Sequence, residues 1–500
     1  MEIIIHTYAY NAAKTIRRTI DSILAQSYHD WIYYVVDNGS TDKTGEIIKE
    51  YANNDARIIP LVNEENNVWK AGNSWRDIMD RSNDDDYFCW LDADDAYMPD
   101  FLSDMLSFIH KYNLDIAACG SQFYTAETDQ QMDKSYSISS DIIITKDGFA
   151  KYFRTYLPFM WTYWGKLYSL SLFHDFSMND FRVSYGWDTI YTMKAFSRAK
   201  RVGILGGTLH KYYISNQSHS YQYNNLRVLS DQICCDVGLD YLRKQKASTT
   251  ENQNLIYGTY SNAIRNTLIL LRNAEIDPLE KLKGICDIFT HKHTQTILNL
   301  KKETDSFLLE LQYQAQKYIF SLPQARNGVG LEYAAAIIAS MRDLPETFDL
   351  DTWRDSEAFD FLIKLRLKCT EIRRISAIDQ QIEQRISKTA LLIDVPAPFA
   401  AYIQSVISAV LHGDLRAALE KVFLLLEREI PDDYAEGLVT LALNLAAMTD
   451  NSSAFLFFKK VWISYLLDCL RFVEARVLLD EYEEILPDDE DLVEMRKRLQ

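Results

Sequence analysis

The stretch Tyr87-Phe88-Cys89-Trp90-Leu91-Asp92-Ala93-Asp94-Asp95 decides how this chain is interpreted. Its first five residues form an apolar run that predicts a buried strand. Three carboxylates that directly follow a strand repel one another unless a cation neutralises them. If the chain stays extended, Asp92 and Asp94 share one face, where both can reach one hard divalent ion or a ribose hydroxyl. Taken alone, the motif is more often a solvated acidic turn, so its meaning depends on the surrounding sequence.

Strand and helix signals alternate through the first 220 or so residues. Strands are expected at 2–7, 31–36 and 57–62, and helices at 11–26, from 41 or 42 to about 52, and at 75–81. This order predicts a parallel, doubly wound α/β sheet, in which ligands bind beyond the carboxyl ends of the strands. Thr7, Asp37 and Asp92 all lie at such ends, and we therefore expect them to form one site.

Composition and charge narrow the class of protein. Hydrophobic residues make up 47% of the chain and charged residues 25%, which is ordinary for a globular protein. The net charge of −18 argues against nucleic acid as a partner and against electrostatic docking on an anionic membrane. The seven cysteines are scattered without a CxxC pair, so buried free thiols in a reducing compartment are expected. With no leader and no apolar span near 18 residues, we expect a cytoplasmic protein with at most peripheral membrane association.

Beyond about residue 222 the strand signals fade and helical periodicity dominates. Helices are expected at 226–243, 254–272, 279–291 and 305–320, with a break at 323–330. Pro396 and Pro398 mark a boundary, so the expected domains are 1–222, 223–395 and 396–500. In the last domain, segments 409–433 and 467–489 each combine small residues, an apolar stretch and Pro-Asp-Asp. This pattern is similar to degenerate tetratricopeptide repeats, and an unrelated helical bundle stays open as the alternative.

Several motifs of the first 222 residues occur in the order and spacing of a known family. They are Ile3–Tyr8, Ser22–Tyr28, Val35–Asp42, Leu91–Asp95, Trp164–Tyr168, Gly186–Asp188 and Lys200–Val202. Together they resemble a family 2 glycosyltransferase of the inverting GT-A fold. The resemblance implies a catalytic domain over 1–222 that transfers a hexose from a nucleoside-diphosphate sugar, most often a UDP-sugar, with Mn²⁺ or Mg²⁺.

The resemblance also implies roles for individual residues. Thr7 and Asp37 would contact the nucleobase, and Asp92 would bind the ribose or line the nucleotide site. Asp94 would bind the metal ion that bridges the diphosphate, where a cation neutralises the charge of the leaving group. Asp188 matches the catalytic base, at the start of a helix expected over 189–196, and would take the proton of the acceptor.

Further residues complete the predicted site. Tyr8, Ala93 and Arg76 are assigned to nucleotide-sugar binding, His210 to the metal shell, and Trp161, Trp164 and Trp187 to the acceptor side. Alternatives stay open for three of these assignments. Arg76 is also compatible with a cation on a helix surface, His210 with a strand-edge histidine, and the aromatic run 158–164 with a core segment.

Two departures from the family pattern concern the same site. His6 stands where the family usually has proline, and Trp187 stands where it usually has an acidic residue. An indole beside Asp188 would desolvate the carboxylate and raise its pKa, which would improve it as a base.

The sequence leaves the acceptor and the role of the helices open. An array of helical hairpins forms a groove suited to peptides, so a protein acceptor is expected slightly before a surface polysaccharide, and homodimerisation through the helices is a further expectation. The alternative is a helical-repeat scaffold whose N-terminal domain binds nucleotide without turnover. A nucleotidyltransferase would need a Gly-rich, Lys-containing loop after the first strand, and residues 6–11 lack both.

Overall fold

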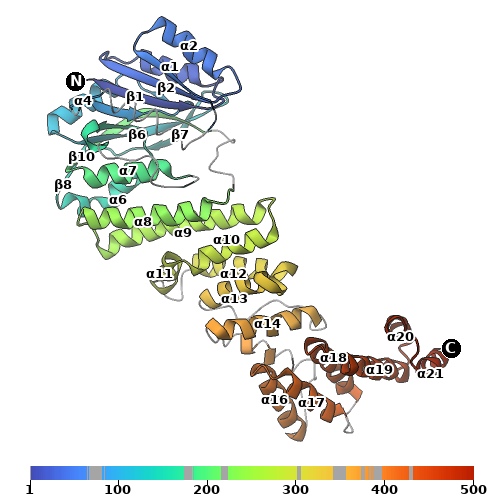
Figure 1. Ribbon diagram of the computed structural model, residues 1–500. Helices are drawn as coiled ribbons and strands as arrows, with labels where there is room; N and C mark the ends of the chain where they lie inside the picture. The colour runs from blue at the N-terminus through green and yellow to red at the C-terminus, as the bar shows by residue number, and fades with distance from the viewer. Residues whose placement is uncertain are drawn as a thin grey trace. The chain divides into compact units, whose positions relative to one another are not determined.

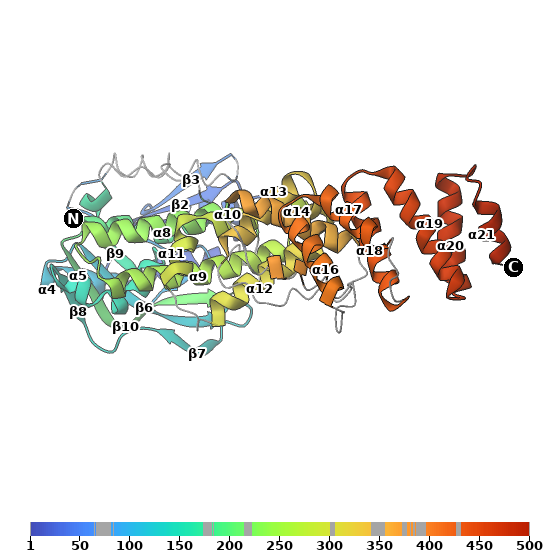
Figure 2. The ribbon, with the colours of Figure 1, turned by 90° about the horizontal axis from the view of Figure 1, so that it is seen from below.

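The computed structural model describes residues 2–64, 66, 82–83, 85–173, 183, 185–214, 223–300, 306–341, 356–372, 378–380, 382–383, 386, 397–426 and 432–499. The chain forms two compact units, Met1–Ala274 and Glu275–Gln500 (Figure 1). The first unit contains the sheet and also helices α8 (Arg227–Lys244) and α9 (Thr250–Asn273), which lie side by side (Figure 2). The domain boundaries at residues 222 and 395 stay predictions.

One mixed sheet organises the first unit. Its strand order is β3-β2-β1-β4-β9-β6-β10-β5, with β7 on β6 and β8 on β10. Strands β1 to β4 (Ile3–Ala9, Trp31–Asn38, Ile58–Asn63 and Tyr87–Trp90) are mutually parallel. The remaining strands are β5 (Ala96–Tyr97), β6 (Ile116–Thr125), β7 (Gln131–Tyr136), β8 (Ile142–Thr145), β9 (Lys166–Ser169) and β10 (Arg201–Ile214).

The second half of the sheet is mixed in direction, and β5, β7 and β8 run antiparallel to the strands that they pair with. Strand β9 is antiparallel to both of its neighbours, β4 and β6, whereas β10 runs parallel to β6. A mostly parallel α/β sheet followed by helices is therefore confirmed as the fold class.

Helices α1 (Ile16–Leu24), α2 (Thr44–Asn54) and α4 (Phe101–Tyr112) pack on the sheet (Figure 1). Ile16, Ile20 and Ile23 of α1 are fully buried, as their spacing predicts. The prediction that this helix begins at residue 11 is wrong. Asn11 has a φ of 49°, in the left-handed region, which a right-handed helix excludes. The helix expected at 75–81 lies outside the described residues.

Helix α7 (Trp187–Arg198) contains Asp188, one of the predicted site residues. It follows the short helices α5 (Gly148–Lys151) and α6 (Phe153–Tyr156) and a 3₁₀ turn, Leu157–Met160. It begins two residues before the expected start, because Gly186 adopts a φ of 79° and ends the preceding loop. A Cβ atom on this glycine would lie 2.7 Å from Sγ of Cys234 in α8, so the loop approaches α8 closely.

Among the described residues of the second unit, the secondary-structure elements are all helices. Its helices are α10 (Pro278–Thr290), α11 (Lys292–Leu300), α12 (Ser306–Ser321), α13 (Gly328–Ser340), α14 (Ser356–Ile372), α16 (Ala397–Leu411), α17 (Leu415–Leu426), α18 (Asp432–Met448), α19 (Ser452–Asp468), α20 (Phe472–Ile485) and α21 (Leu492–Arg498). From α16 to α21, each helix packs on the next one (Figure 2). The likeness to tetratricopeptide repeats stays a prediction.

Two smaller observations complete the fold. All seven cysteines are free, but Cys469, which follows the last turn of α19, is exposed and Cys234 is half-buried, so the expectation that every thiol is buried is wrong for these two residues. In the part of the chain that the structure describes, no helix has the length and apolar character needed to cross a membrane.

Candidate active site

The carboxyl ends of three parallel strands meet at one edge of the sheet. Thr7 of β1 is buried, and its Oγ1 donates a hydrogen bond to the carbonyl of Leu91, directly after β4, at 2.7 Å. The same Oγ1 lies 2.8 Å from the hydroxyl of Tyr33 in β2. Asp37 pairs with Ala9 across β1 and β2. The structure therefore brings Thr7, Asp37 and the start of the acidic stretch to one place, as the topology predicts.

Asp37 lies against the first turn of α2. Its side chain is only 7% exposed, and its Oδ1 accepts a hydrogen bond from the backbone N–H of Ser40 at 3.0 Å. A Cβ atom on Gly45 would lie 2.4 Å from the other carboxylate oxygen, so the helix backbone approaches the carboxylate closely. The positive potential at a helix N-terminus favours a carboxylate in this position.

The neighbouring β1 residues differ in exposure. Tyr8 is half-buried, and its ring makes an edge-to-face contact with His6 at 4.4 Å between centroids. His6, which replaces the usual proline, is buried, and burial lowers its pKa to about 3, so the ring is neutral. Arg76 lies outside the described residues.

Residues 92–95, here called the acidic loop, are held by side chains of α1 and of the turn before it. Three donors reach three consecutive backbone carbonyls: Thr15 Oγ1 to Ala93 at 2.8 Å, Arg18 Nη2 to Asp94 at 2.6 Å and Thr19 Oγ1 to Asp95 at 2.9 Å. The Arg18 guanidinium also lies 3.5 Å from the centre of the Tyr213 ring, a cation–π contact. The backbone of the loop is therefore fixed independently of its carboxylates.

The three carboxylates of the acidic loop have different surroundings. Asp92 is half-buried and accepts a hydrogen bond from the hydroxyl of Tyr163. Asp95 is buried, and its Oδ1 accepts a hydrogen bond from the backbone N–H of Tyr213 at 2.8 Å. Burial and mutual repulsion raise the pKa of Asp92 and of Asp95 well above the usual range. Asp94 alone of the three is exposed, so it is the carboxylate open to a ligand.

His210 of β10 lies beside Asp95. Its Nε2 is 3.3 Å from Oδ2 of Asp95, its Nδ1 is 3.1 Å from Oγ of Ser121, and its ring stacks on Trp164 at 4.4 Å between centroids. The side chain is fully buried, and burial lowers its pKa to about 3. The structure thus places this neutral histidine beside Asp95, and its role as a metal ligand stays a prediction.

No group of three or more His, Cys, Asp or Glu side chains is placed to hold a metal ion among the described residues. An ion held by one or two carboxylates and by substrate phosphates does not require such a group. Exposed carboxylate oxygen on Asp94 suits the hard cations Mn²⁺ and Mg²⁺.

The first turn of α7 carries Asp188, and we call this turn the base end of the site. The carboxylate is half-buried, and its Oδ1 accepts a hydrogen bond from the backbone N–H of Thr189 at 2.9 Å. Burial raises the pKa of Asp188 to about 6, and Lys166 acts in the opposite direction. The predicted direction of this pKa shift agrees with the structure. The ring of Trp187 stacks on Tyr191 at 5.7 Å, and its own contribution to the pKa stays a prediction.

Residues 161–164, here called the aromatic segment, connect the acidic loop to the base end. The Tyr163 hydroxyl binds Asp92, while two hydroxyls of α7 donate to backbone carbonyls of the segment. These are Thr189 Oγ1 to Trp161 at 2.9 Å and Thr192 Oγ1 to Thr162 at 2.8 Å. Of the predicted acceptor-side residues, Trp161 is 39% exposed, whereas Trp164 is half-buried against His210.

Sequence reasoning did not assign a role to Tyr163 or to Lys166. Tyr163 stands inside the aromatic run 158–164, and Lys166 stands inside a family motif, so both positions carried a signal. The fold is needed to see that the Tyr163 hydroxyl donates a hydrogen bond to Asp92. It is also needed to see that the charge of Lys166 lowers the pKa of Asp188.

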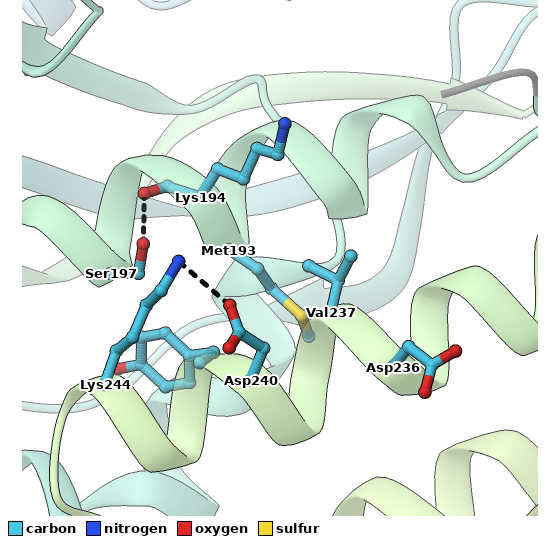
Figure 3. Close-up of a pocket in the computed structure, with 8 residues that line it drawn as sticks. Met193, Lys194, Ser197, Asp236, Val237, Asp240 and Lys244 are labelled. Carbon is cyan, nitrogen blue, oxygen red and sulfur yellow. Dashed lines mark hydrogen bonds and ion pairs between the residues drawn. The ribbon is translucent and has the colours of Figure 1, made fainter. Parts of the chain in front are cut away.

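Residues of α7 and α8 line a separate hollow (Figure 3). It is lined by Met193, Lys194, Ser197, Asp236, Val237, Asp240, Tyr241 and Lys244, and Asp240 forms an ion pair with Lys244 at 2.9 Å. None of the predicted site residues lines it, so we do not assign the active site to this hollow.

Comparisons with known proteins point to the same part of the chain. Residues 4–169 match the family model of glycosyl transferase family 2. Glycosyltransferase GlyA of Streptococcus pneumoniae is 28% identical over 223 residues, which cover 42% of this chain and 30% of that protein. EpsJ of Bacillus subtilis, described as an uncharacterized glycosyltransferase, is 27% identical over 206 residues, which cover 41% of this chain and 58% of that protein.

A solved structure is also similar. TarS residues 1–349 of S. aureus, in complex with UDP, match with a TM-score of 0.44 and 15% identity, covering 70% of this chain and 92% of that chain. The chain spans less than two thirds of the length of the two curated relatives. The segment that matches the glycosyl transferase family 2 model, residues 4–169, spans strands β1 to β9 of the mixed sheet.

Proposed function

We propose that this protein is a metal-dependent, inverting glycosyltransferase. It moves a hexose from a nucleoside-diphosphate sugar, with a UDP-sugar as the expected donor, to a protein or surface-polysaccharide acceptor. The observation that carries the proposal is the aromatic segment, which contacts both Asp92 of the acidic loop and the α7 turn of Asp188. The family 2 match favours an enzyme over the alternative of an inactive, nucleotide-binding scaffold.

The strand edge forms the donor side. Thr7 and Asp37 would contact the nucleobase with Tyr8 and Ala93 nearby, and Asp92 would bind the ribose. Asp94 would hold Mn²⁺ or Mg²⁺, because its exposed carboxylate supplies the oxygen ligands that these ions prefer. When bound, the ion neutralises the negative charge that develops on the leaving diphosphate.

Asp188 acts as the general base. With a pKa of about 6, its carboxyl is mostly ionised at neutral pH and is still basic enough to accept the proton of an attacking hydroxyl. Attack from the face opposite the diphosphate inverts the anomeric carbon. The exposed ring of Trp161, whose carbonyl binds the α7 residue Thr189, offers an apolar face to the acceptor.

The proposals about the acceptor, the cellular location and the oligomeric state rest on the sequence alone. Helical hairpins suit an extended acceptor, so a protein is proposed before a polysaccharide. The cytoplasmic location with at most peripheral membrane association, and the homodimer through the helices, stay predictions.

A donor screen tests the proposal. Nucleotide release is measured for UDP- and GDP-sugars with Mn²⁺, with Mg²⁺ and with EDTA, for the full-length chain and for Asp94→Ala. We expect one donor to be hydrolysed slowly, with activity lost in EDTA and lowered on the order of 10²–10³-fold in the variant. Metal-dependent UDP binding without turnover of any donor, even with candidate acceptors added, would favour the scaffold.

A further inference from the structure

Lys166, the first residue of β9, is a buried cation with no role in the mechanism above. Its side chain is 1% exposed. Its Nζ donates hydrogen bonds to three oxygens, the carbonyl of Thr162 at 2.7 Å, Oγ1 of Thr162 at 3.2 Å and the carbonyl of Trp164 at 2.9 Å. These three acceptors use all three donors of an ammonium group. Because burying an ammonium is unfavourable, its full set of partners points to a specific function.

The aromatic segment that Lys166 holds is attached on both of its sides. On the donor side, the hydroxyl of Tyr163 donates to Asp92. On the other side, Thr192 of α7 donates to the carbonyl of Thr162, which is the same oxygen that Lys166 binds. Thr192 lies four residues after Asp188, so the two side chains share one face of α7.

The charge of Lys166 acts on the base end. The titratable groups that interact electrostatically with Asp188 come from several elements: Lys166 and Tyr168 of β9, Tyr163 of the aromatic segment, Asp92 of the acidic loop and Cys234 of α8. Burial lowers the pKa of Lys166 to about 7, so near pH 6, where Asp188 titrates, its amine is mostly protonated and favours the ionised form of Asp188, whereas Asp92 opposes it.

We propose that Lys166 is a positioning residue for the transfer reaction, which fixes the aromatic segment between Asp92 and α7 and sets a positive charge beside Asp188. This inference rests on the proposed function, because it takes Asp188 as the base. Lys166 reaches the reaction only through the aromatic segment and through its charge, so its loss affects turnover more than nucleotide binding.

The first test replaces Lys166 with methionine, which keeps the length of the side chain and removes its charge and its donors. Lys194→Met, on the α7 face that lines the separate hollow (Figure 3), is the matched control. Donor hydrolysis is followed from pH 5 to pH 9, and Mn²⁺-dependent UDP binding is measured by calorimetry. We expect kcat of Lys166→Met to fall about ten- to a hundredfold. We expect its acidic limb to move up by about one pH unit, with UDP binding and the control unchanged.

The second variant, Thr192→Val, distinguishes the effect of positioning the aromatic segment from the effect of the Lys166 charge. It also tests the inference if Lys166→Met does not fold. It removes one tie of the aromatic segment and leaves every charge in place, so kcat should fall while the acidic limb stays where it is in the wild type. Wild-type kcat in either folded variant, or an unmoved acidic limb in Lys166→Met, overturns the inference. If the wild type itself turns over no donor, the proposed function fails instead, and this inference fails with it.

Discussion

The acidic loop and the base end are held in place by different kinds of contact. The backbone of the acidic loop is bound by hydroxyl and guanidinium donors from a single short stretch, Thr15 to Thr19. The base end is bound to the aromatic segment, which depends in turn on Lys166 and on Asp92. One region is therefore fixed by one helix and its entry turn, and the other by a chain of partners from several elements.

This difference separates binding from turnover. The carboxylates of the acidic loop stand on a backbone that does not need the base end, so the donor side should bind metal and nucleotide when α7 is altered. The base end shares the aromatic segment with Asp92, so its geometry follows that of the donor side. Substitutions at the base end should therefore change kcat with little change in nucleotide affinity.

The largest effect is expected for Asp188→Asn. An amide of the same shape does not accept the proton, so kcat should fall about 10²–10⁴-fold, the usual contribution of a general base. The Kd for UDP with Mn²⁺, measured by calorimetry, should stay at its wild-type value. Asp240→Asn, in the hollow lined by α7 and α8 (Figure 3), is a matched control that should keep full activity. An Asp188→Asn variant with activity close to wild type would assign the base elsewhere.

The next largest effect is expected in the pH dependence of kcat/KM for the wild type. A base works in its unprotonated form, and burial raises the pKa of Asp188 from its ordinary value near 3.8 to about 6. The value of kcat/KM should therefore be half-maximal near pH 6 and should fall about tenfold for each pH unit below that midpoint. A midpoint close to pH 4 would show that the carboxylate stays hydrated in the free enzyme, contrary to its position in the structure.

The strand edge and the acidic loop were predictable because their signals are local. Alternation of apolar residues marks each strand, and the parallel order brings Thr7, Asp37 and Asp92 to one edge without any knowledge of side-chain packing. The start of α1 was not predictable from apolar spacing. That spacing continues toward Asn11, but the backbone of this residue is in the left-handed region and cannot be part of a right-handed helix.

The base end was predictable only in part. Asp188 stands in a recognisable motif, but the partners of its turn are separated from it in the sequence. The bond from Tyr163 to Asp92 spans 71 residues, and the stack of Trp164 on His210 depends on where β9 and β10 lie in the sheet. Such contacts follow from the complete topology, and a single sequence does not display them.

The smallest effect is expected at Thr19, and it tests whether the acidic loop is as independent as the comparison requires. Thr19 is fully buried, and its Oγ1 donates to the carbonyl of Asp95 at 2.9 Å. Thr19→Val keeps the shape and leaves that carbonyl without this donor, which should lower the free energy of unfolding by about 1–3 kcal/mol, measured in urea.

The two neighbouring bonds, from Thr15 and Arg18, still hold the loop in this variant. Donor hydrolysis and UDP affinity should therefore stay close to wild type at a temperature well below the unfolding midpoint. Thr15→Val, which removes a bond from a half-buried hydroxyl, should cost less stability and serves as the matched control. If Thr19→Val instead lost UDP binding while its stability stayed unchanged, the loop would depend on each bond separately, and the contrast with the base end would not hold.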